Sequence, residues 1–343
     1  MRAYDDERRL ALAMSAPKRE NYERYLASSR RTADVDYLPI KLDIENVSRC
    51  NFACAMCAVS TWPKRQRARD MTLDEFKALI DEQTGLVEIK LNGLGEALMQ
   101  GDDYFQMVRY ARARHIWVRM TTNASLLHMR DNYRKLADAD VNEIDISIDG
   151  CDAETFEAIR VGGNFRIVTR NCATLNGHLA SRGMTRTKMW TLVQHANYQR
   201  LYDHVKLAHD LGFKHLVFSL TLHGWADESL AARNAEVQVE PDFDYLWGLI
   251  EWGNQLGVIV RFWTVADKFD TDAPEHLCPW PFERAVVTSD SRTVPCCMIA
   301  NPDKFEIGRG QSFGQAWAGE DYRAFRQAHL DGKIPAVCKG CYR

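Results

Sequence analysis

From about residue 38 onward, short β-branched and aromatic runs alternate with amphipathic stretches. The runs that predict strands span residues 40–46, 86–92, 117–122, 143–148, 189–194 and 215–220. Between them, stretches such as 72–83, 104–114 and 201–211 carry apolar residues at helical spacing, and Thr72 is a candidate N-cap of the first. Such alternation predicts an α/β fold with a parallel sheet. Six βα units predict a partial (β/α)6 TIM-like barrel with function at the carboxyl ends of its strands.

Both ends of the chain depart from this pattern. Residues 1–38 predict one or two charged helices that either cap the bottom of the barrel or dock across it. Another strand is predicted at 258–264. Beyond it, a hairpin is predicted with strands at 285–288 and 293–296, followed by a helix near 312–329. We therefore expect a helical segment (1–38), a barrel (39–265) and a separate, small cysteine-bearing domain (266–343).

Composition and charge exclude several classes of protein. The 343 residues are 46% hydrophobic and 27% charged, as in ordinary globular domains, and the formal net charge is −3. The one short basic stretch lies at 64–69, so no nucleic-acid partner is expected. No apolar run approaches the roughly 18 residues that cross a bilayer, and the N-terminus lacks an apolar signal core. We expect no membrane partner and a cytoplasmic location.

The chain contains ten cysteines. Without an export signal they predict metal binding or catalysis rather than disulfides, because the cytosol keeps thiols reduced. Cys151 and Cys172 stand apart and are expected to be small, partly buried side chains. The other eight form two groups, Cys50, Cys54 and Cys57 near the start and Cys278, Cys296, Cys297, Cys338 and Cys341 near the end.

The first group has the spacing C-x3-C-x2-C and follows the first predicted strand, on a loop where three thiolates can converge. Structural zinc takes four ligands, whereas an iron–sulfur cluster held by three cysteines keeps one iron open. This arrangement resembles the radical S-adenosylmethionine (SAM) superfamily. The resemblance implies a [4Fe–4S] cluster on Cys50, Cys54 and Cys57, whose open iron chelates the amino and carboxylate groups of the methionine of SAM.

Three motifs after successive predicted strands extend the resemblance. Residues 91–97, Leu-Asn-Gly-Leu-Gly-Glu-Ala, resemble the Gly-Gly-Glu loop that receives the amino group of SAM. Residues 121–123 resemble Thr-Thr-Asn-Gly with alanine in place of the glycine, and 147–150 resemble the Ser-x-Asp-Gly motif near the ribose. Arg160 is a candidate partner of the methionine carboxylate, and Met56 stands where an aromatic residue usually lies near the adenine. The implied cofactor-binding residues are Met56, Gly93, Gly95, Glu96, Thr122, Asn123, Ser147, Asp149 and Arg160.

The second group places one cysteine before the predicted hairpin, one at its end, and a closing C-x2-C. Four thiolates bind either zinc or a fully ligated iron–sulfur cluster, and the spacing does not separate these. The layout resembles the Twitch domain, a shortened SPASM domain, which implies a second, auxiliary [4Fe–4S] cluster. Its implied ligands are Cys278, Cys296, Cys338 and Cys341. Cys297 is the alternative to Cys296; otherwise it faces the substrate or is an inert buried thiol.

No motif names the substrate. The layout is similar to that of an aminocyclitol dehydrogenase, and together with the short N-terminal segment this favours a small polar substrate: a sugar, aminocyclitol or nucleoside. The resemblance implies that a 5′-deoxyadenosyl radical abstracts hydrogen from it, followed by oxidation, and that an external reductant such as flavodoxin or ferredoxin supplies electrons. A peptide maturase, a redox-neutral epimerase or dehydratase, and a non-catalytic iron–sulfur protein remain alternatives.

Residues near the ends of the late predicted strands are candidates for substrate contact. They are Gln194, His195, Ser219, Thr221 and His223. For the tryptophans of this half of the chain we expect packing in the core or at an interface. These are Trp190, Trp247, Trp252 and Trp263.

Overall fold

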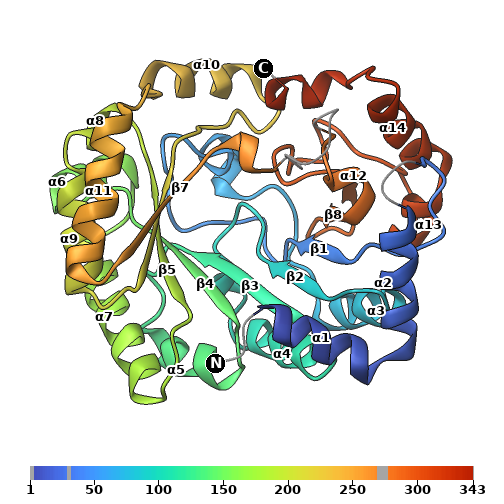
Figure 1. Ribbon diagram of the computed structural model, residues 1–343, viewed down its shortest axis with the longest axis horizontal. Helices are drawn as coiled ribbons and strands as arrows, with labels where there is room; N and C mark the ends of the chain where they lie inside the picture. Colours follow the sequence, from blue (N-terminus) through green and yellow to red (C-terminus); the bar gives the residue numbers. More distant parts are fainter. Residues whose placement is uncertain (1–3, 29–31, 269–276, 343) are drawn as a thin grey trace.

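The computed structural model describes residues 4–28, 32–268 and 277–342, which contain one nine-stranded sheet in the order β7-β6-β5-β4-β3-β2-β1-β8-β9. All neighbouring strands are parallel except β8 and β9, which are antiparallel. The strands are β1 (Lys41–Ile44), β2 (Glu88–Leu91), β3 (Trp117–Thr122), β4 (Glu143–Ser147), β5 (Thr187–Leu192), β6 (His215–Ser219), β7 (Ile259–Trp263), β8 (Arg284–Val287) and β9 (Thr293–Val294). The sheet curves into an open, partial barrel with helices outside it (Figure 1), which confirms the expected fold class.

Fourteen α-helices accompany these strands in the described residues. They are α1 (Tyr4–Met14), α2 (Ala16–Ser28), α3 (Leu73–Glu82), α4 (Asp102–Arg112), α5 (Asn132–Asp138), α6 (Ala153–Ile159), α7 (Phe165–Ser181), α8 (His195–Tyr198), α9 (Leu201–Asp210), α10 (Glu228–Val237), α11 (Phe243–Leu256), α12 (Trp280–Glu283), α13 (Phe313–Ala318) and α14 (Glu320–Leu330). The predicted N-cap of α3 is confirmed, because Thr72 Oγ1 accepts from Glu75 N (3.2 Å) and Glu75 Oε2 accepts from Thr72 N (2.8 Å). The single helix expected near 312–329 is two helices, since the backbone is extended at Gly319.

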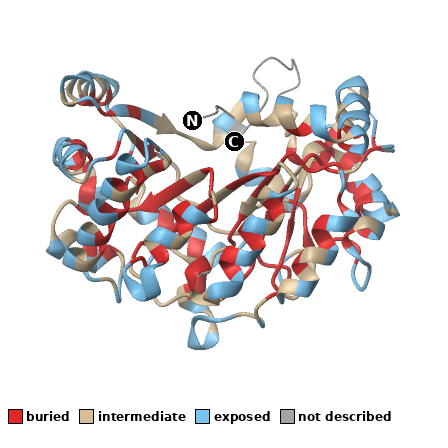
Figure 2. Ribbon diagram, turned by 90° about the horizontal axis from the view of Figure 1, so that it is seen from below, coloured by how far each residue is buried: buried red, intermediate tan, exposed pale blue. Residues whose placement is uncertain are grey.

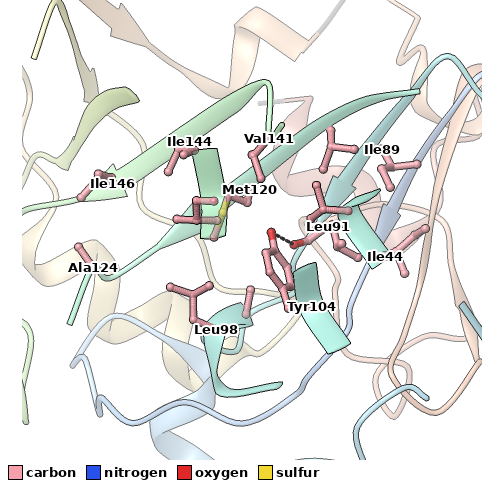
Figure 3. Packing of buried hydrophobic residues seen from close by; sticks show 14 of the residues in the cluster. Ile44, Ile89, Leu91, Leu98, Tyr104, Met120, Ala124, Val141, Ile144 and Ile146 are labelled. Carbon is pink, nitrogen blue, oxygen red and sulfur yellow. Dashed lines mark hydrogen bonds between the residues drawn. The ribbon is translucent and has the colours of Figure 1, made fainter. Parts of the chain in front are cut away.

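The two faces of the sheet differ in chemistry. Apolar side chains such as Ile44, Leu91 and Met120 point to the outer, helix-covered face, where Tyr104 also packs and donates to Leu91 O (3.3 Å, Figure 3). Figure 2 shows this buried layer along the strands and the exposed outer sides of the helices. The alternate residues line the inside of the barrel, and at its bottom they are charged.

These inner charges are buried and paired. Arg284 of β8 contacts Glu88 (3.1 Å) and Asp43 (3.4 Å), and Arg119 contacts Glu143 (2.9 Å). Pairing is required because an isolated buried charge is costly. The ion pairs therefore link β8 and β2 across the inside of β1.

The C-terminal hairpin continues the barrel sheet. β8 pairs in parallel with β1, Lys41 opposite Arg284 and Ile44 opposite Val287. Although the sequence predicts a separate C-terminal domain, the hairpin of that region extends the sheet of the barrel. The pairing satisfies the outer edge of β1, which would otherwise present unpaired backbone groups. The proposed boundary near residue 266 stays a prediction.

Helices α1 and α2 cover the amino ends of the strands. The ring of Tyr4 packs edge-on against Trp117, the first residue of β3, with centroids 5.5 Å apart. Asn21 exchanges two hydrogen bonds with the backbone of Leu38, just before β1 (2.9 and 2.7 Å). Of the two expected arrangements, the helices thus adopt the one that caps the bottom of the barrel. No helix of the described residues is both long and apolar enough to cross a bilayer.

Candidate active site

The loop that carries the three N-terminal cysteines follows β1 and is held on both sides by backbone hydrogen bonds. Cys50 N donates to Arg65 O (3.2 Å), and Ala53 N donates to Val161 O (2.8 Å). Arg65 belongs to the basic stretch noted in the sequence, and Val161 follows α6. The two segments therefore fix the backbone of the loop before any metal binds.

The three thiols lie close to one another. Burial raises the pKa of Cys50 to about 12, with further contributions from Glu96 and from the thiols of Cys54 and Cys57. Burial and the neighbouring Cys54 raise the pKa of Cys57 to about 11. Three adjacent sulfur donors match the donor set of a [4Fe–4S] cluster with one open iron, and binding would displace their protons. In the described part of the chain, no three His, Cys, Asp or Glu side chains are grouped around one ion site, so the ligand assignment stays a prediction.

Glu96 joins the end of β2 to the end of β3. It is 2% exposed, and its carboxylate accepts from Thr122 Oγ1 (2.7 Å) and Asn123 N (2.8 Å). Burial raises the pKa of Glu96, although these hydrogen bonds oppose the shift. Because Glu96 also raises the pKa of Cys50, its carboxylate lies near the cysteine loop, where a positively charged group would be favoured.

The two predicted glycines before Glu96 are required by close packing. A Cβ atom on Gly95 would lie 2.5 Å from the carbonyl oxygens of both Val47 and Arg49, and one on Gly93 would lie 2.7 Å from Glu45 Cβ. Only glycine fits at either position. The β2 loop therefore packs directly against the segment that leads from β1 into the cysteine loop.

A network of polar side chains connects the end of β3 to the cysteine loop. Asn123 Nδ2 donates to Asn51 Oδ1 (3.0 Å), Asn51 Nδ2 donates to Ser125 Oγ (2.9 Å), and Ser125 Oγ donates to Asn123 Oδ1 (2.7 Å). The sequence predicted a role for Asn123 but missed Asn51 and Ser125. The only signal was the position of Asn51 between two cysteines of the motif.

Ala124 occupies the place of the usual glycine in this motif, and the structure shows why glycine suits it. Ala124 is fully buried with φ +60°, in the left-handed region that a Cβ atom disfavours. Its N–H donates to Thr122 Oγ1 (3.0 Å). The chain thus keeps the turn of the motif at some cost in backbone strain.

Asp149 and Arg160 form a buried ion pair near the end of β4. Arg160 Nε and Nη2 both lie 2.7 Å from Asp149 Oδ2, and Asp149 Oδ1 accepts from Leu192 N (2.8 Å). Burial alone would lower the pKa of Arg160, but Asp149 and the nearby thiols of Cys54 and Cys57 outweigh it and raise that pKa. Arg160 thus lies between Asp149 and the cysteine loop, an interaction that the sequence did not predict.

Ser147 and Met56 complete the set of predicted cofactor-binding residues. Ser147 is the buried last residue of β4, two positions before Asp149 on the same face of the strand. Met56 is also buried, and its carbonyl accepts from Asn234 Nδ2 of α10 (3.2 Å). The same amide donates to His223 O (2.6 Å), so α10 ties the cysteine loop to the segment after β6.

Three of the C-terminal cysteines, Cys278, Cys338 and Cys341, also lie near one another. Burial raises the pKa of Cys338 to about 12, with contributions from Cys278 and Cys341. Cys278 N donates to the phenol oxygen of Tyr342 (3.2 Å), which fixes the segment before α12 next to the closing C-x2-C. Sulfur donors in this arrangement fit a fully ligated auxiliary cluster.

Cys296 and Cys297 contribute to the pKa values of different residues. Cys296, together with Cys278, contributes to the raised pKa of Tyr322, whose main cause is burial. Cys297 instead contributes to the raised pKa of Asp43 inside the barrel, which burial brings to about 6. The choice of Cys296 rather than Cys297 as the fourth ligand stays a prediction. Of the two isolated cysteines, Cys172 is fully buried and Cys151 partly so, as expected.

The candidate substrate contacts fall into different environments. Gln194 caps α8, Thr221 Oγ1 accepts from Val265 N (3.2 Å), and Ser219 is buried, whereas His195 is exposed. Nothing in these contacts brings the five candidates into one cluster. The tryptophans also diverge. Trp252 packs on the core as expected, but Trp247 is 63% exposed, and Trp190 and Trp263 lie inside the barrel.

Comparison with known proteins identifies the family. The model of the radical SAM superfamily matches residues 47–233, more than half of the chain, and that of an iron–sulfur cluster-binding domain (SPASM) matches 278–342. Together the two domains imply [4Fe–4S] clusters and SAM as cofactors. The cysteine groups described above lie in these two regions.

Curated relatives and solved structures agree with this assignment. Mycofactocin maturase MftC of Mycolicibacterium smegmatis is 30% identical over 50% of this chain, and the match covers 42% of the length of that protein. MftC of Mycobacterium tuberculosis is 30% identical over 88% of this chain and 75% of its own length. SuiB of Streptococcus suis bound to precursor peptide SuiA has a TM-score of 0.66 at 12% identity, covering 89% of this chain and 70% of SuiB, which shows the shared fold.

These relatives correct one expectation. A small polar molecule was expected as the substrate partner, but the matched proteins are a mycofactocin maturase, the PqqA peptide cyclase of Bradyrhizobium diazoefficiens (24% identical over 92% of this chain and 82% of that protein), and SuiB, whose structure contains a precursor peptide. The expectation of a small-molecule partner, which relied on the layout of an aminocyclitol dehydrogenase and on the short N-terminal segment, was wrong. The chain belongs to the radical SAM superfamily, with a C-terminal SPASM iron–sulfur domain.

Proposed function

We propose that this radical SAM enzyme is a peptide maturase, which abstracts hydrogen from a residue of a precursor peptide. The observation that carries the proposal is the match to MftC of Mycobacterium tuberculosis, 30% identical over 88% of this chain. The PqqA peptide cyclase match, which covers 92% of the chain, supports it. The peptide maturase was the alternative to a small-molecule dehydrogenase in the sequence analysis.

The site supports this chemistry through three elements. Cys50, Cys54 and Cys57 would hold the first cluster, which, once reduced by an external one-electron donor, would supply the 5′-deoxyadenosyl radical from bound SAM. Glu96 offers a buried carboxylate to the amino group of SAM. Arg160 has five N–H donors, of which Asp149 uses two, so donors remain for a carboxylate.

The C-terminal cysteines suggest the fate of the peptide radical. In this proposal Cys278, Cys296, Cys338 and Cys341 ligate every corner of the auxiliary cluster, so substrate does not bind to its iron. An auxiliary cluster held there would supply a one-electron acceptor beside the peptide. The proposed net reaction is a two-electron oxidation of the peptide: one electron leaves with the hydrogen atom that passes to 5′-deoxyadenosine, and the second goes to that acceptor as a proton is released. Electron transfer by the auxiliary cluster is thus the second part of the proposal.

The test uses the reconstituted protein with SAM, dithionite and short peptides encoded next to its gene. We expect one peptide to stimulate 5′-deoxyadenosine formation and to lose two hydrogens by mass spectrometry. The variant with Cys50, Cys54 and Cys57 all replaced by alanine is the control, and it should form neither product. If 5′-deoxyadenosine accumulates equally with and without every peptide and no peptide changes mass, the maturase proposal is wrong.

A further inference from the structure

Four aromatic side chains form a continuous row inside the barrel: Trp190, Trp263, His223 and Trp225, here called the aromatic row. Ring centroids of Trp190 and Trp263 are 6.0 Å apart, those of Trp263 and His223 are 5.7 Å apart, and those of His223 and Trp225 are 5.7 Å apart. The last two pairs meet edge to face. The row runs from β5 across β7 to the segment after β6.

The row lies beside the residues implied in SAM binding. Trp190 is the register partner of Ser147 on β4, and Trp263 is the register partner of Ser219 on β6. The neighbours of Trp190 along β5, Met189 and Thr191, are buried on the outer face, whereas Trp190 is only partly buried. The tryptophans therefore face the inside of the barrel and keep accessible ring surface at the carboxyl ends of the strands.

The segment that carries His223 and Trp225 is held in a defined place. Asn234 binds both His223 O (2.6 Å) and Met56 O (3.2 Å), so this segment is fixed to the cysteine loop. Trp225 has φ +53° and Ala226 has φ +61°, conformations that non-glycine residues seldom adopt and that persist where surrounding contacts impose them. The row is thus pre-formed next to the first cluster site.

Trp225 also carries an unused hydrogen-bond donor. Its Nε1 atom is buried and has no hydrogen-bond partner among the described residues. Buried indole N–H groups usually have a partner, because leaving one unsatisfied is costly. A carbonyl oxygen of a bound peptide would supply that partner.

The charges near the row select against one class of side chain. Arg261 precedes Trp263 by two residues on the same face of β7 and is exposed. Lys188 precedes Trp190 in the same way, although Glu143 pairs with it (2.9 Å). Aromatic faces attract cations as well as other rings, but Arg261 would repel a lysine or arginine of the peptide beside Trp263. A neutral aromatic side chain fits the row best.

We infer that the aromatic row is the binding site for an aromatic side chain of the peptide substrate, with Trp225 Nε1 donating to a peptide carbonyl. The inference rests on the proposed peptide maturase function and names the residue class that the site recognises. The bound ring would pack edge-on or offset against Trp190 and Trp263. Its peptide backbone would then lie between the row and the SAM-binding motifs of β1 to β4.

The test measures binding, without turnover, of three capped tripeptides, acetyl-Gly-X-Gly-amide with X tyrosine, leucine or lysine. Saturation-transfer NMR on the reconstituted protein with SAM detects such weak ligands. We expect the tyrosine peptide to bind at least about fivefold more tightly than the leucine peptide, and the lysine peptide to bind most weakly. Equal affinities for the three peptides would overturn the inference.

Three variants locate the binding. Trp263→Leu should weaken binding of the tyrosine peptide about fivefold. Trp225→Phe, which keeps a ring but removes the N–H, should weaken binding of this peptide about threefold. Trp247→Leu is the matched control, because Trp247 is exposed on α11 outside the barrel, and it should change nothing. If Trp225→Phe and Trp263→Leu, both folded by circular dichroism, bind the tyrosine peptide like the wild type, the row is not the site.

This result separates the inference from the proposed function. If the tyrosine peptide binds at the row but no neighbouring gene product is modified, the inference stands and the maturase proposal fails. If a precursor peptide is modified and its KM is the same in the wild type and in both row variants, the maturase proposal stands and the inference fails.

Discussion

Arg160 approaches one oxygen of Asp149 with two nitrogens, Nε and Nη2, each at 2.7 Å, and the side chain of Asp149 is completely buried. The pair connects the end of β4 to the residue that follows α6, beside the cysteine loop. It therefore contributes both to stability and to the shape of the SAM-binding side of the barrel.

Replacing Asp149 by asparagine should lower the free energy of unfolding by about 3 kcal/mol, because it leaves the charge of Arg160 buried without its partner. Denaturant unfolding under anaerobic conditions measures this. Asp138→Asn is the control, since the Asp138–Arg182 pair is exposed and its loss should cost less than about 0.5 kcal/mol. Equal effects of the two substitutions would contradict the structural role of Asp149.

Replacing Glu96 by glutamine should weaken SAM binding about tenfold or more, because a charge-assisted contact is lost while the shape of the side chain is kept. Equilibrium binding of SAM to reconstituted protein measures it, and the iron content should not change. Glu75→Gln, a change of the same type at the start of α3 and outside the site, serves as the control. Unchanged SAM affinity in Glu96→Gln would rule out the proposed contact.

Iron analysis tests the ligand assignment. About eight irons per chain are expected for two [4Fe–4S] clusters, and about four when Cys50, Cys54 and Cys57 are all alanine. Cys296→Ser should lose the auxiliary cluster, whereas Cys297→Ser should keep it. Zinc in the C-terminal site, or cluster loss in Cys297→Ser alone, would show that the assignment of that site is wrong.

Ala124 offers a test of backbone strain. Ala124→Gly relieves the left-handed conformation but removes a buried methyl group, so the free energy of unfolding should stay within about 1 kcal/mol of the wild type. Ala124→Val should lower it by about 3 kcal/mol, since a β-branched residue disfavours φ +60° and overpacks a fully buried site. Thermal unfolding of the two variants, compared side by side, decides this prediction. A valine variant as stable as the glycine variant would show that neither strain nor packing limits this position.

The barrel strands were predictable because each is a short run rich in β-branched, aromatic or other apolar residues between helical stretches, and this pattern is local. The first cysteine loop was predictable for the same reason, since its three cysteines lie within eight residues. The pairing of β8 with β1 was not, because no periodicity encodes which distant strand fills an edge. The Asp149–Arg160 pair and the Asn51–Asn123–Ser125 network likewise depend on side chains that meet only in the folded chain.

The substrate was the part that the sequence predicted worst. The short N-terminal segment argues against a peptide only if it is the part that binds substrate, but α1 and α2 contact the amino ends of the strands. For Trp190 and Trp263 the sequence predicts packing in the core or at an interface, because of their large apolar surface. Only the register with Ser147 and Ser219 shows that they face the inside of the barrel.

The parallel pairing of β1 with β8 also has a consequence for biosynthesis. At ordinary translation rates β1 leaves the ribosome more than about ten seconds before β8, so the nascent chain exposes one edge of β1 during this interval. The cysteine loop directly follows β1, so it leaves the ribosome early in this interval. Metal delivery to the loop therefore need not wait for the C-terminal domain. A chain that terminates before Arg284 would keep that edge open permanently, which makes premature termination products of this protein prone to aggregation.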